Sequence, residues 1–352
     1  MSKSYLDEIA EQPAAIRGLG LLITPAMTAA VEAIRARIDA GEVRHIILTG
    51  MGGSLFSAYG TSLRLSHSLS VPVSLWDSSE LIQQAPSVLR PGTLVIAISQ
   101  SGESIELRRM AELDRGTSVK VAITNTPDNT LSRWADLKLA TNVGPEQTVS
   151  TKTYTAGLVA LYILERLLIG DTGTLAVEID TLANAIEDLL STLPGKMEET
   201  LAFLGHDMPL SFIGRGASYA SAMMAALVTA EAAKASTQAF SGGQFRHGPL
   251  ELVREGFRSV LFIGGGDATF DLNLKTVSDI ARLGGRCLVV APEHTAAALP
   301  HDQIALILPS VVEGLLPVLE ILPIQLLMVP MASARGFEPA KFLNGSKVTV
   351  IE

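Results

Sequence analysis

A short β-rich run followed by a glycine turn and a helix recurs along this chain of 352 residues. Residues 43–49 (VRHIILT) lead into Gly50–Ser54, and residues 93–99 (TLVIAIS) lead into a serine- and glycine-containing turn before a helix. The same plan returns in the second half, where residues 210–213 run into Gly214–Ser218. Alternation of this kind is typical of parallel sheets covered by helices.

We therefore predict an α/β protein with two similar doubly wound parallel-sheet domains, each a three-layer α/β/α arrangement. Further strands are predicted at 119–124, 259–263, 286–291 and 303–308. The predicted divisions are an N-terminal helical segment (1–40), a first domain (41–172), a linking helix (173–205), a second domain (206–335) and a C-terminal tail (336–352).

The composition excludes several classes of protein. The net charge of -9 argues against a nucleic-acid partner, because a phosphate backbone requires a basic face. Cys287 is the one cysteine and stands in an apolar stretch, so the sequence offers neither a disulfide within the chain nor a cysteine metal site. No spacing of His, Asp and Glu predicts a metal centre.

No segment of the sequence is predicted to direct the chain to a membrane. The N-terminus lacks an apolar core of signal-peptide length, and a lone cysteine fits a reducing compartment, so we expect a cytoplasmic protein. The most hydrophobic region, Val311–Ala332, contains two glutamates and three prolines. We interpret it as buried core or subunit interface, not as a membrane span.

Three turns combine glycine or hydroxyl residues at predicted strand ends: Ser99–Ser104 (SQSGES), Gly50–Ser54 (GMGGS) and Val149–Lys152 (VSTK). Backbone N–H groups, hydroxyls and a helix N-terminus can together hold a phosphate without a lysine. The alternative is that these serines and threonines only cap helices. None of the turns matches a Walker loop or the dinucleotide fingerprint, so we expect no nucleotide cofactor.

Two residues are candidates for proton transfer. Glu231 lies in an alanine-rich helical stretch, where an apolar setting can raise a carboxyl pKa toward a general base. His247 stands between Arg246 and a Gly-Pro pair, in a predicted loop. The alternative is a solvated helix glutamate and a histidine that only makes loop hydrogen bonds. The other five histidines have no comparable context.

The motifs SQSGES, STK and FRHGPLE, in this order on a double α/β plan, resemble the sugar isomerase (SIS) domain family. Within it, the chain is most similar to the isomerase half of glucosamine-6-phosphate synthase and to its stand-alone relatives. EIAEQPAAI near the N-terminus resembles the family's first helix, and KVT near the C-terminus resembles its tail. The similarity covers essentially the whole chain.

The resemblance implies two SIS domains and a sugar phosphate bound at the strand ends of the first one, with no metal or organic cofactor. The implied phosphate ligands are Ser54, Ser99, Gln100, Ser101 and Ser104, while Ser150 and the backbone near Val149 would line the sugar. In the family a helix glutamate sixteen residues before the HGP histidine moves protons between C1 and C2, and Glu231 stands sixteen before His247.

The family histidine assists ring opening and reaches in from the neighbouring subunit, which implies a homodimer with His247 at its interface. The tail lysine, here Lys347, closes over the site. Three positions depart from the synthase pattern: Val228 where it has a lysine, Gln244 where the family often has a glutamate, and Gly345–Ser346 before the tail lysine. The segment before STK is also about one residue shorter than in the synthase.

The synthase also hydrolyses glutamine with an N-terminal cysteine that this sequence lacks, so we expect no glutaminase activity. The expected function is that of a phosphosugar isomerase-type enzyme acting on a hexose or amino-hexose 6-phosphate. Aldose–ketose isomerisation and deamination of a glucosamine-6-phosphate type of substrate both fit. The alternatives are a fructosamine-6-phosphate-type deglycase, a non-catalytic sugar-phosphate sensor, and a sugar with another anionic group in place of phosphate.

Overall fold

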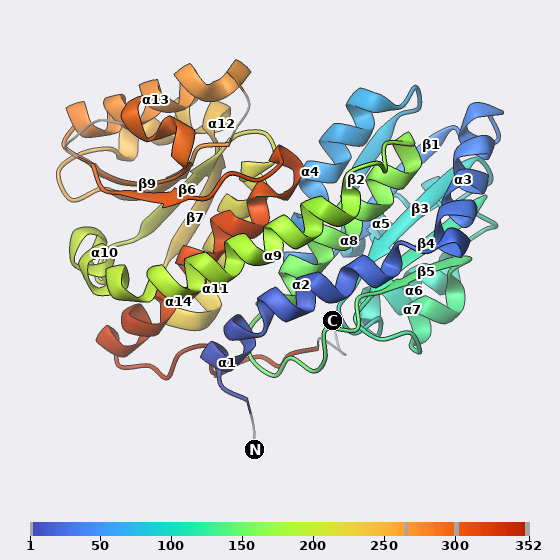
Figure 1. Cartoon of the computed structure of the whole chain (residues 1–352), viewed down its shortest axis with the longest axis horizontal. Coiled ribbons are helices and arrows are strands. Elements are labelled where there is room, and N and C mark those ends of the chain that lie inside the picture. The colour runs from blue at the N-terminus through green and yellow to red at the C-terminus, as the bar shows by residue number, and fades with distance from the viewer. Residues whose placement is uncertain (1–2, 265–266, 299–302, 349–352) are drawn as a thin grey trace. The chain divides into compact units, whose positions relative to one another are not determined.

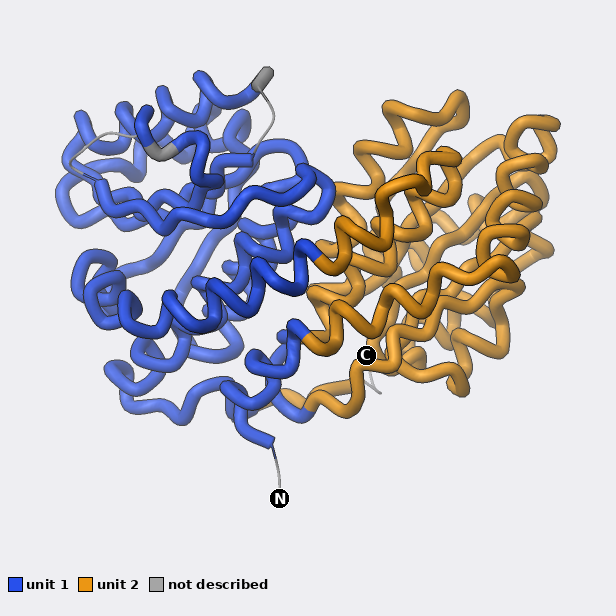
Figure 2. The backbone as a smooth tube through the Cα atoms, viewed as in Figure 1, with its two compact units in different colours: residues 1–13, 147–151, 181–343 blue, residues 14–146, 152–180, 344–352 orange. Residues whose placement is uncertain are grey.

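The computed structural model describes residues 3–264, 267–298 and 303–348, and the chain divides into two compact units (Figure 2). The first-sheet unit comprises Ala14–Glu146, Lys152–Asp180 and Asn344–Glu352, in orange. The second-sheet unit comprises Met1–Pro13, Gln147–Thr151 and Thr181–Leu343, in blue. Residues 349–352 of the predicted tail lie outside the described residues.

The first-sheet unit is built on five parallel strands: β1 (His45–Gly50), β2 (Val73–Asp77), β3 (Thr93–Ile98), β4 (Val119–Thr124) and β5 (Leu137–Ala140). Their order across the sheet is β2-β1-β3-β4-β5, with Thr49 of β1 beside Ala97 of β3. The residues of β3 are fully or almost fully buried, which explains the continuous apolar run in the sequence.

Helices cover both faces of this sheet (Figure 1). Ile47, Val95 and Ala97 belong to a core cluster with residues of α5 (Ser78–Gln84), α6 (Ile105–Leu113) and α7 (Thr130–Trp134). The helices α3 (Pro25–Asp39), α4 (Gly53–Ser68) and α8 (Lys152–Ile169) pack with one another on the other face. The helices that follow β1 and β3, α4 and α6, therefore leave on opposite faces.

The second-sheet unit repeats this plan. Its parallel strands are β6 (Leu210–Gly214), β7 (Thr237–Ser241), β8 (Arg258–Phe262), β9 (Arg286–Pro292) and β10 (Ala305–Leu308), in the order β10-β9-β8-β6-β7. Numbered from the first strand of its own sheet, each unit has the order 2-1-3-4-5. The prediction of two similar parallel-sheet α/β domains is confirmed.

The second sheet is also covered on both faces. The helices α10 (Met197–Leu204), α11 (Ser218–Ala233) and α14 (Leu316–Ala334) pack together on one face. The core of the other face includes residues of α12 (Gly242–Arg246) and α13 (Asp267–Arg282). The remaining α-helices are α1 (Tyr5–Ala10), α2 (Gln12–Leu19) and α9 (Leu175–Thr192).

Three strands were not predicted from the sequence: β2, β5 and β7. Each lies at an edge of its sheet. These three strands are partly exposed, as the half-buried pattern of β2 shows, so they lack the continuous apolar run that identified the interior strands and the fourth edge strand, β10. Cys287, in the interior strand β9, is fully buried, and burial raises the pKa of its thiol to about 12.

The apolar segment predicted as core forms α14, which continues through Pro323 and Pro330. Together with the residues just before it, this helix (Glu313–Ala334) is apolar and long enough to cross a membrane. However, 89% of its most apolar stretch of 18 residues is buried in the protein. That burial is the pattern of a core helix. Glu320 in α14 is fully buried and accepts hydrogen bonds from the hydroxyls of Ser218 (2.7 Å) and Ser221 (2.5 Å).

Burial raises the pKa of Glu320 from 4.5 to about 7, so the folded state holds this proton more tightly than the unfolded state. The contribution of Glu320 to stability is therefore most favourable below pH 4.5 and is lost as pH rises to about 7, by up to about 3 kcal/mol. We expect Glu320→Gln to remove this loss. Urea unfolding of both proteins at pH 5 and pH 8 measures the free energy of unfolding. If variant and wild type differ in this free energy by the same amount at both pH values, the pKa of Glu320 is not raised in the folded protein.

Candidate active site

The carboxyl ends of β1 and β3 lie side by side, and the helices that follow them leave on opposite faces of the sheet. Ligands in open parallel α/β sheets bind in the crevice at such a point of the topology. Ser54 lies in the first turn of α4, directly after the turn that follows β1, and the loop after β3 contains Ser99, Gln100, Ser101 and Ser104. The structure thus brings these five predicted phosphate ligands to one edge of the first sheet.

The loop after β3 is held tightly against α7. The Ser99 hydroxyl accepts a hydrogen bond from the Gly102 amide (3.0 Å). Gly102 has φ +66°, and a Cβ there would lie 2.0 Å from Oδ1 of Asn129, the N-cap of α7. The Glu103 carboxylate accepts bonds from the amide (2.7 Å) and hydroxyl (2.8 Å) of Thr130. The loop is therefore preorganised, and only glycine fits at position 102.

Ser104 occupies the N-cap of α6, but its side chain makes no capping hydrogen bond. Its Oγ is buried and has no hydrogen-bond partner among the described residues. A buried hydroxyl without a partner is uncommon in a folded protein. The N-terminus of α6 therefore presents a donor and a positive helix end that a bound anion could satisfy.

The turn after β1 depends on Gly50. A Cβ on this residue would lie 3.0 Å from the Leu55 amide nitrogen and 3.0 Å from the Ile98 carbonyl oxygen, tighter than side chains normally pack. Its absence lets α4 begin directly against the strand ends. Ser54 is the second residue of α4 and is half-buried, so it is not the N-cap of that helix.

A second group of predicted residues lies in the second-sheet unit. Val149 is fully buried and Ser150 is half-buried. The segment before them is fixed by the buried Glu8 carboxylate, which accepts bonds from the amides of Gln147 (2.5 Å) and Thr148 (3.3 Å) and from the Thr148 hydroxyl. Sequence reasoning missed this role of Glu8, although it noted the EIAEQP stretch.

A cavity of about 440 Å³ lies next to this segment, bounded by α1, α14 and the chain after α14. Its lining consists of Lys3, Ser4, Tyr5, Leu6, Gln147, Thr148, Val329, Glu338, Pro339, Ala340, Lys341 and Phe342. Glu231 is half-buried in the last turn of α11, beside Ala232, whose carbonyl accepts a bond from the Ala340 amide (3.2 Å). The Glu231 turn thus contacts the chain segment that lines this cavity.

Glu231 and His247 lie at opposite ends of the strands of the second sheet, here called its amino edge and its carboxyl edge. Helix α11 runs back from the carboxyl end of β6, so Glu231 is at the amino edge, where β7 begins. His247 follows α12 after β7 ends, so it is at the carboxyl edge, and its side chain is exposed. The five residues of β7 alone span about 16 Å. One chain therefore does not bring these two residues together.

Lys347 pairs with the fully buried carboxylate of Glu146 in the first-sheet unit (Nζ–Oε2 2.5 Å). Glu146 also accepts bonds from the amide (3.0 Å) and hydroxyl (2.6 Å) of Thr153. Burial acts to raise the pKa of Glu146, but Lys347 and Thr153 outweigh it and hold that pKa below its usual value. The partners are 201 residues apart, so no local pattern in the sequence identifies Glu146.

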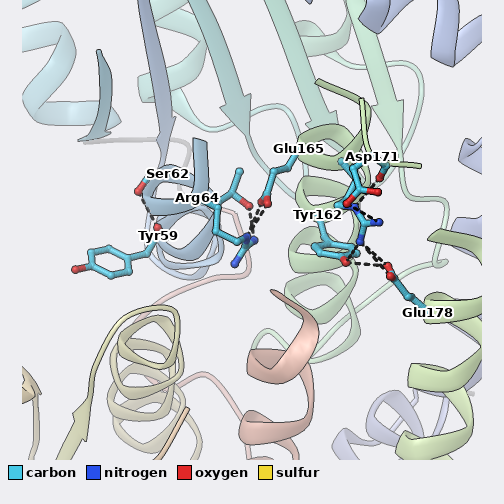
Figure 3. A network of polar contacts seen from close by, with 9 residues as sticks. Tyr59, Ser62, Arg64, Tyr162, Glu165, Asp171 and Glu178 are labelled. Atoms are coloured by element: carbon cyan, nitrogen blue, oxygen red, sulfur yellow. Dashed lines mark hydrogen bonds and ion pairs between the residues drawn. The ribbon is translucent and has the colours of Figure 1, made fainter. Parts of the chain in front are cut away.

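One ion pair fastens α4, which carries Ser54, to α8, and a second ion pair fastens α8 to α9 (Figure 3). Arg64 of α4 donates from Nε to both carboxylate oxygens of Glu165 in α8, at 2.7 and 2.8 Å. Further along α8, Arg166 pairs with Glu178 of α9 (2.8 Å), which also accepts a bond from the Tyr162 hydroxyl (2.8 Å). This network holds the helix behind the β1 turn in a fixed position.

The described residues contain no group of three or more His, Cys, Asp or Glu side chains that could hold a metal ion. The groups named at the two sites are hydroxyls, backbone amides, a carboxylate and a lysine. Hydroxyls and amides suit an anion, and a half-buried carboxylate suits proton transfer.

Lys347→Met removes one cation that pairs with the buried Glu146 carboxylate. We expect the free energy of unfolding at pH 7 to fall by about 1–3 kcal/mol. Because the pKa of Glu146 is lowered in the folded protein, this stabilisation is present at neutral pH and is lost as pH falls through the folded pKa. Wild type and variant should therefore converge on acidification.

The control is the double variant Lys347→Met/Glu146→Gln, which removes both charges and should recover part of the loss. Urea unfolding at pH 7 measures all three proteins. Equal stability of Lys347→Met and wild type would show that the pair contributes nothing.

Comparison with known proteins identifies the fold. Residues 42–165 match the SIS domain family. The chain is 30% identical over 353 residues to a glutamine–fructose-6-phosphate aminotransferase (isomerizing) of Pyrobaculum aerophilum, a match that covers 99% of this chain and 57% of that protein. The chain thus spans little more than half the length of the curated relatives it matches.

Solved structures agree in fold along the whole chain. The C-terminal domain of glucosamine-fructose-6-phosphate aminotransferase from Francisella tularensis has a TM-score of 0.84 at 23% identity, covering 97% of this chain and 98% of that one. A glucosamine-6-phosphate deaminase from Thermotoga maritima has a TM-score of 0.75 at 19% identity, covering 99% and 100%. Residues 42–165 of this chain belong to the SIS domain family, as the SQSGES and STK motifs predicted.

Proposed function

We propose that this chain is a phosphosugar isomerase-type enzyme acting on a hexose or amino-hexose 6-phosphate in the cytoplasm. The observation that carries the proposal is the anion site at the β1 and β3 turns, above all the buried Ser104 Oγ without a partner among the described residues. The names of the relatives above, a fructose-6-phosphate aminotransferase and a glucosamine-6-phosphate deaminase, support the same substrate class.

In the proposed complex, Ser54, Ser99, Gln100, Ser101 and Ser104 surround the phosphate with hydroxyls and amides. Because these donors are fixed before the ligand arrives, binding the phosphate orients the carbon chain at little entropic cost. Ser150 and the backbone at Val149 are the proposed contacts to the sugar. The overall charge of -9 does not oppose this, since the donors are local dipoles.

Glu231 is the proposed acid/base. In an isomerisation it takes a proton from the carbon beside the carbonyl and returns it to the neighbouring carbon, through an enediol. In an amino sugar the same transfer converts the C2 amine into an imine, and water then releases ammonia and leaves the ketose. Both reactions use one proton path, and the substituent at C2 decides between them.

The proposed active unit is a homodimer. Since Glu231 and His247 lie at opposite edges of one sheet, they can act on the same sugar only if His247 comes from a second chain. His247 is exposed beside Gly248 and Pro249, as an interface residue would be in the free protomer. Its proposed role is proton transfer to and from the ring oxygen during ring opening.

Lys347 is the proposed tail lysine at the site, held by Glu146 when no substrate is present. We propose no glutamine hydrolysis by a cysteine of this sequence. Cys287 is fully buried in β9 and burial raises the pKa of its thiol to about 12, so it is not a nucleophile.

The test is turnover of a panel of 6-phosphosugars: glucosamine, fructose, glucose, mannose and fructosamine-type phosphates, following ammonia, amine and ketose–aldose products. We expect one member to react, and Glu231→Gln to lower kcat about 10²–10⁴-fold because general acid–base catalysis is lost. Asp180→Asn, a surface carboxylate on α9, is the matched control.

Each other outcome has a meaning. Tight binding across the panel without turnover would favour a sugar-phosphate sensor, and release of an amine from the fructosamine phosphate would favour a deglycase. Tighter binding of a sulfonated sugar than of the phosphorylated one would indicate that the anionic group of the substrate is a sulfonate and not a phosphate. The absence of both binding and turnover for every sugar in the panel would contradict the proposal.

Shared sites predict complementation between two inactive variants. Glu231→Gln and His247→Asn should each be inactive alone, whereas a mixed dimer holds one site with both native residues. Co-refolding equal amounts should restore about a quarter of wild-type activity, the statistical share of intact sites in a C2 dimer. No recovery despite mixed dimers detected by mass spectrometry would contradict the shared site.

A further inference from the structure

The chain after α14 is fastened to the last turn of α11. Arg335 donates from Nε to the carbonyl of Ala233 (3.0 Å) and from Nη2 to the carbonyl of Lys234 (3.0 Å). The Ala340 amide donates to the Ala232 carbonyl (3.2 Å). These are carbonyls at a helix end, which lack partners within the helix. The tail therefore completes the C-terminus of the helix that carries Glu231.

Lys234 adds a side-chain bridge between the same two elements. Its Nζ donates to the carbonyl of Glu231 (2.5 Å) and to the carbonyl of Lys341 (2.5 Å). Burial lowers the pKa of Lys234, and the charge of Glu231 opposes that shift, so the ammonium and the Glu231 carboxylate interact. One side chain thus hydrogen-bonds to the backbone of the Glu231 turn and interacts electrostatically with its carboxylate.

The backbone of Lys234 supports a role for this side chain. Lys234 is the C-cap of α11 with φ +53° and ψ 33°, a left-handed conformation that glycine adopts without strain. A lysine here is less favourable than glycine for the backbone alone. The two carbonyl contacts of Nζ are what glycine could not supply.

We propose that Lys234 is a positioning residue, which holds the Glu231 turn and the tail at Lys341 in one arrangement. The inference rests on the proposed function of Glu231. Lys234 itself transfers no proton in this account.

The experiment compares three substitutions at this position with a neighbouring control. Lys234→Met removes both donated bonds, and Lys234→Arg keeps the charge and donors. Lys341→Met is the control, because the exposed Lys341 side chain pairs with Glu338 and the substitution leaves the Lys341 carbonyl in place. Lys234→Gly relieves the left-handed strain while removing the bridge, so it should fold even if Lys234→Met does not.

We expect Lys234→Met and Lys234→Gly to lower kcat about 10–100-fold with KM for the phosphosugar changed less than about threefold, because misplaced catalytic groups slow the chemical step without weakening phosphate binding. Lys234→Arg should restore kcat to within about threefold, and Lys341→Met should behave as wild type. Unchanged kcat in Lys234→Gly, or no rescue by arginine, would overturn the proposal.

A second readout does not need activity. Chymotrypsin cleaves after exposed phenylalanines, and the tail contains Phe337 and Phe342. Cleavage there should be faster in Lys234→Met and Lys234→Gly than in wild type and Lys341→Met. If no sugar in the panel reacts, the proposed function fails, but the cleavage rate still reports on the bridge that Lys234 makes to the tail. Equal cleavage rates in all variants would overturn the proposed role of that bridge.

Discussion

Parallel pairing of β1 with β3, with α4 and α6 departing on opposite faces, is the constraint on which the candidate site depends. It leaves the carboxyl ends of two neighbouring strands uncovered by either helix. Gly50 and Gly102 then let the two turns pack against Leu55 and Asn129, where any side chain would collide. The result is a set of fixed hydroxyls and amides that can bind an anion in a protein of net charge -9.

The second sheet has the same strand order, but the turn after its first strand has a different environment. Its first turn leads into α11 through Ser218, and the Ser218 and Ser221 hydroxyls donate to Glu320 of α14. A carboxyl of the protein itself thus occupies the start of the helix that corresponds to α4. The residues proposed for chemistry in this unit lie elsewhere: Glu231 is at the far end of α11, and His247 follows β7. Repetition of a fold therefore did not produce a repeated site.

Much of the fold could be predicted from the sequence, because central parallel strands are continuous apolar runs and their turns contain glycine. The edge strands β2, β5 and β7 could not, since they are short and half-exposed. Of the site, the serine turns and Glu231 carry local signals. The anchors Glu8 and Glu146 do not, because their partners Thr148 and Lys347 lie 140 and 201 residues away. A buried carboxylate is recognised only when the fold shows what surrounds it.

If the turns after β1 and β3 hold a phosphate, a crystal structure with a bound hexose 6-phosphate will show it there. We expect the phosphate at the carboxyl ends of β1 and β3, within hydrogen-bond distance of the Ser104 hydroxyl and of amides in the loop at residues 99–104. The same phosphate bound elsewhere, with the Ser104 hydroxyl still unpartnered, would contradict it.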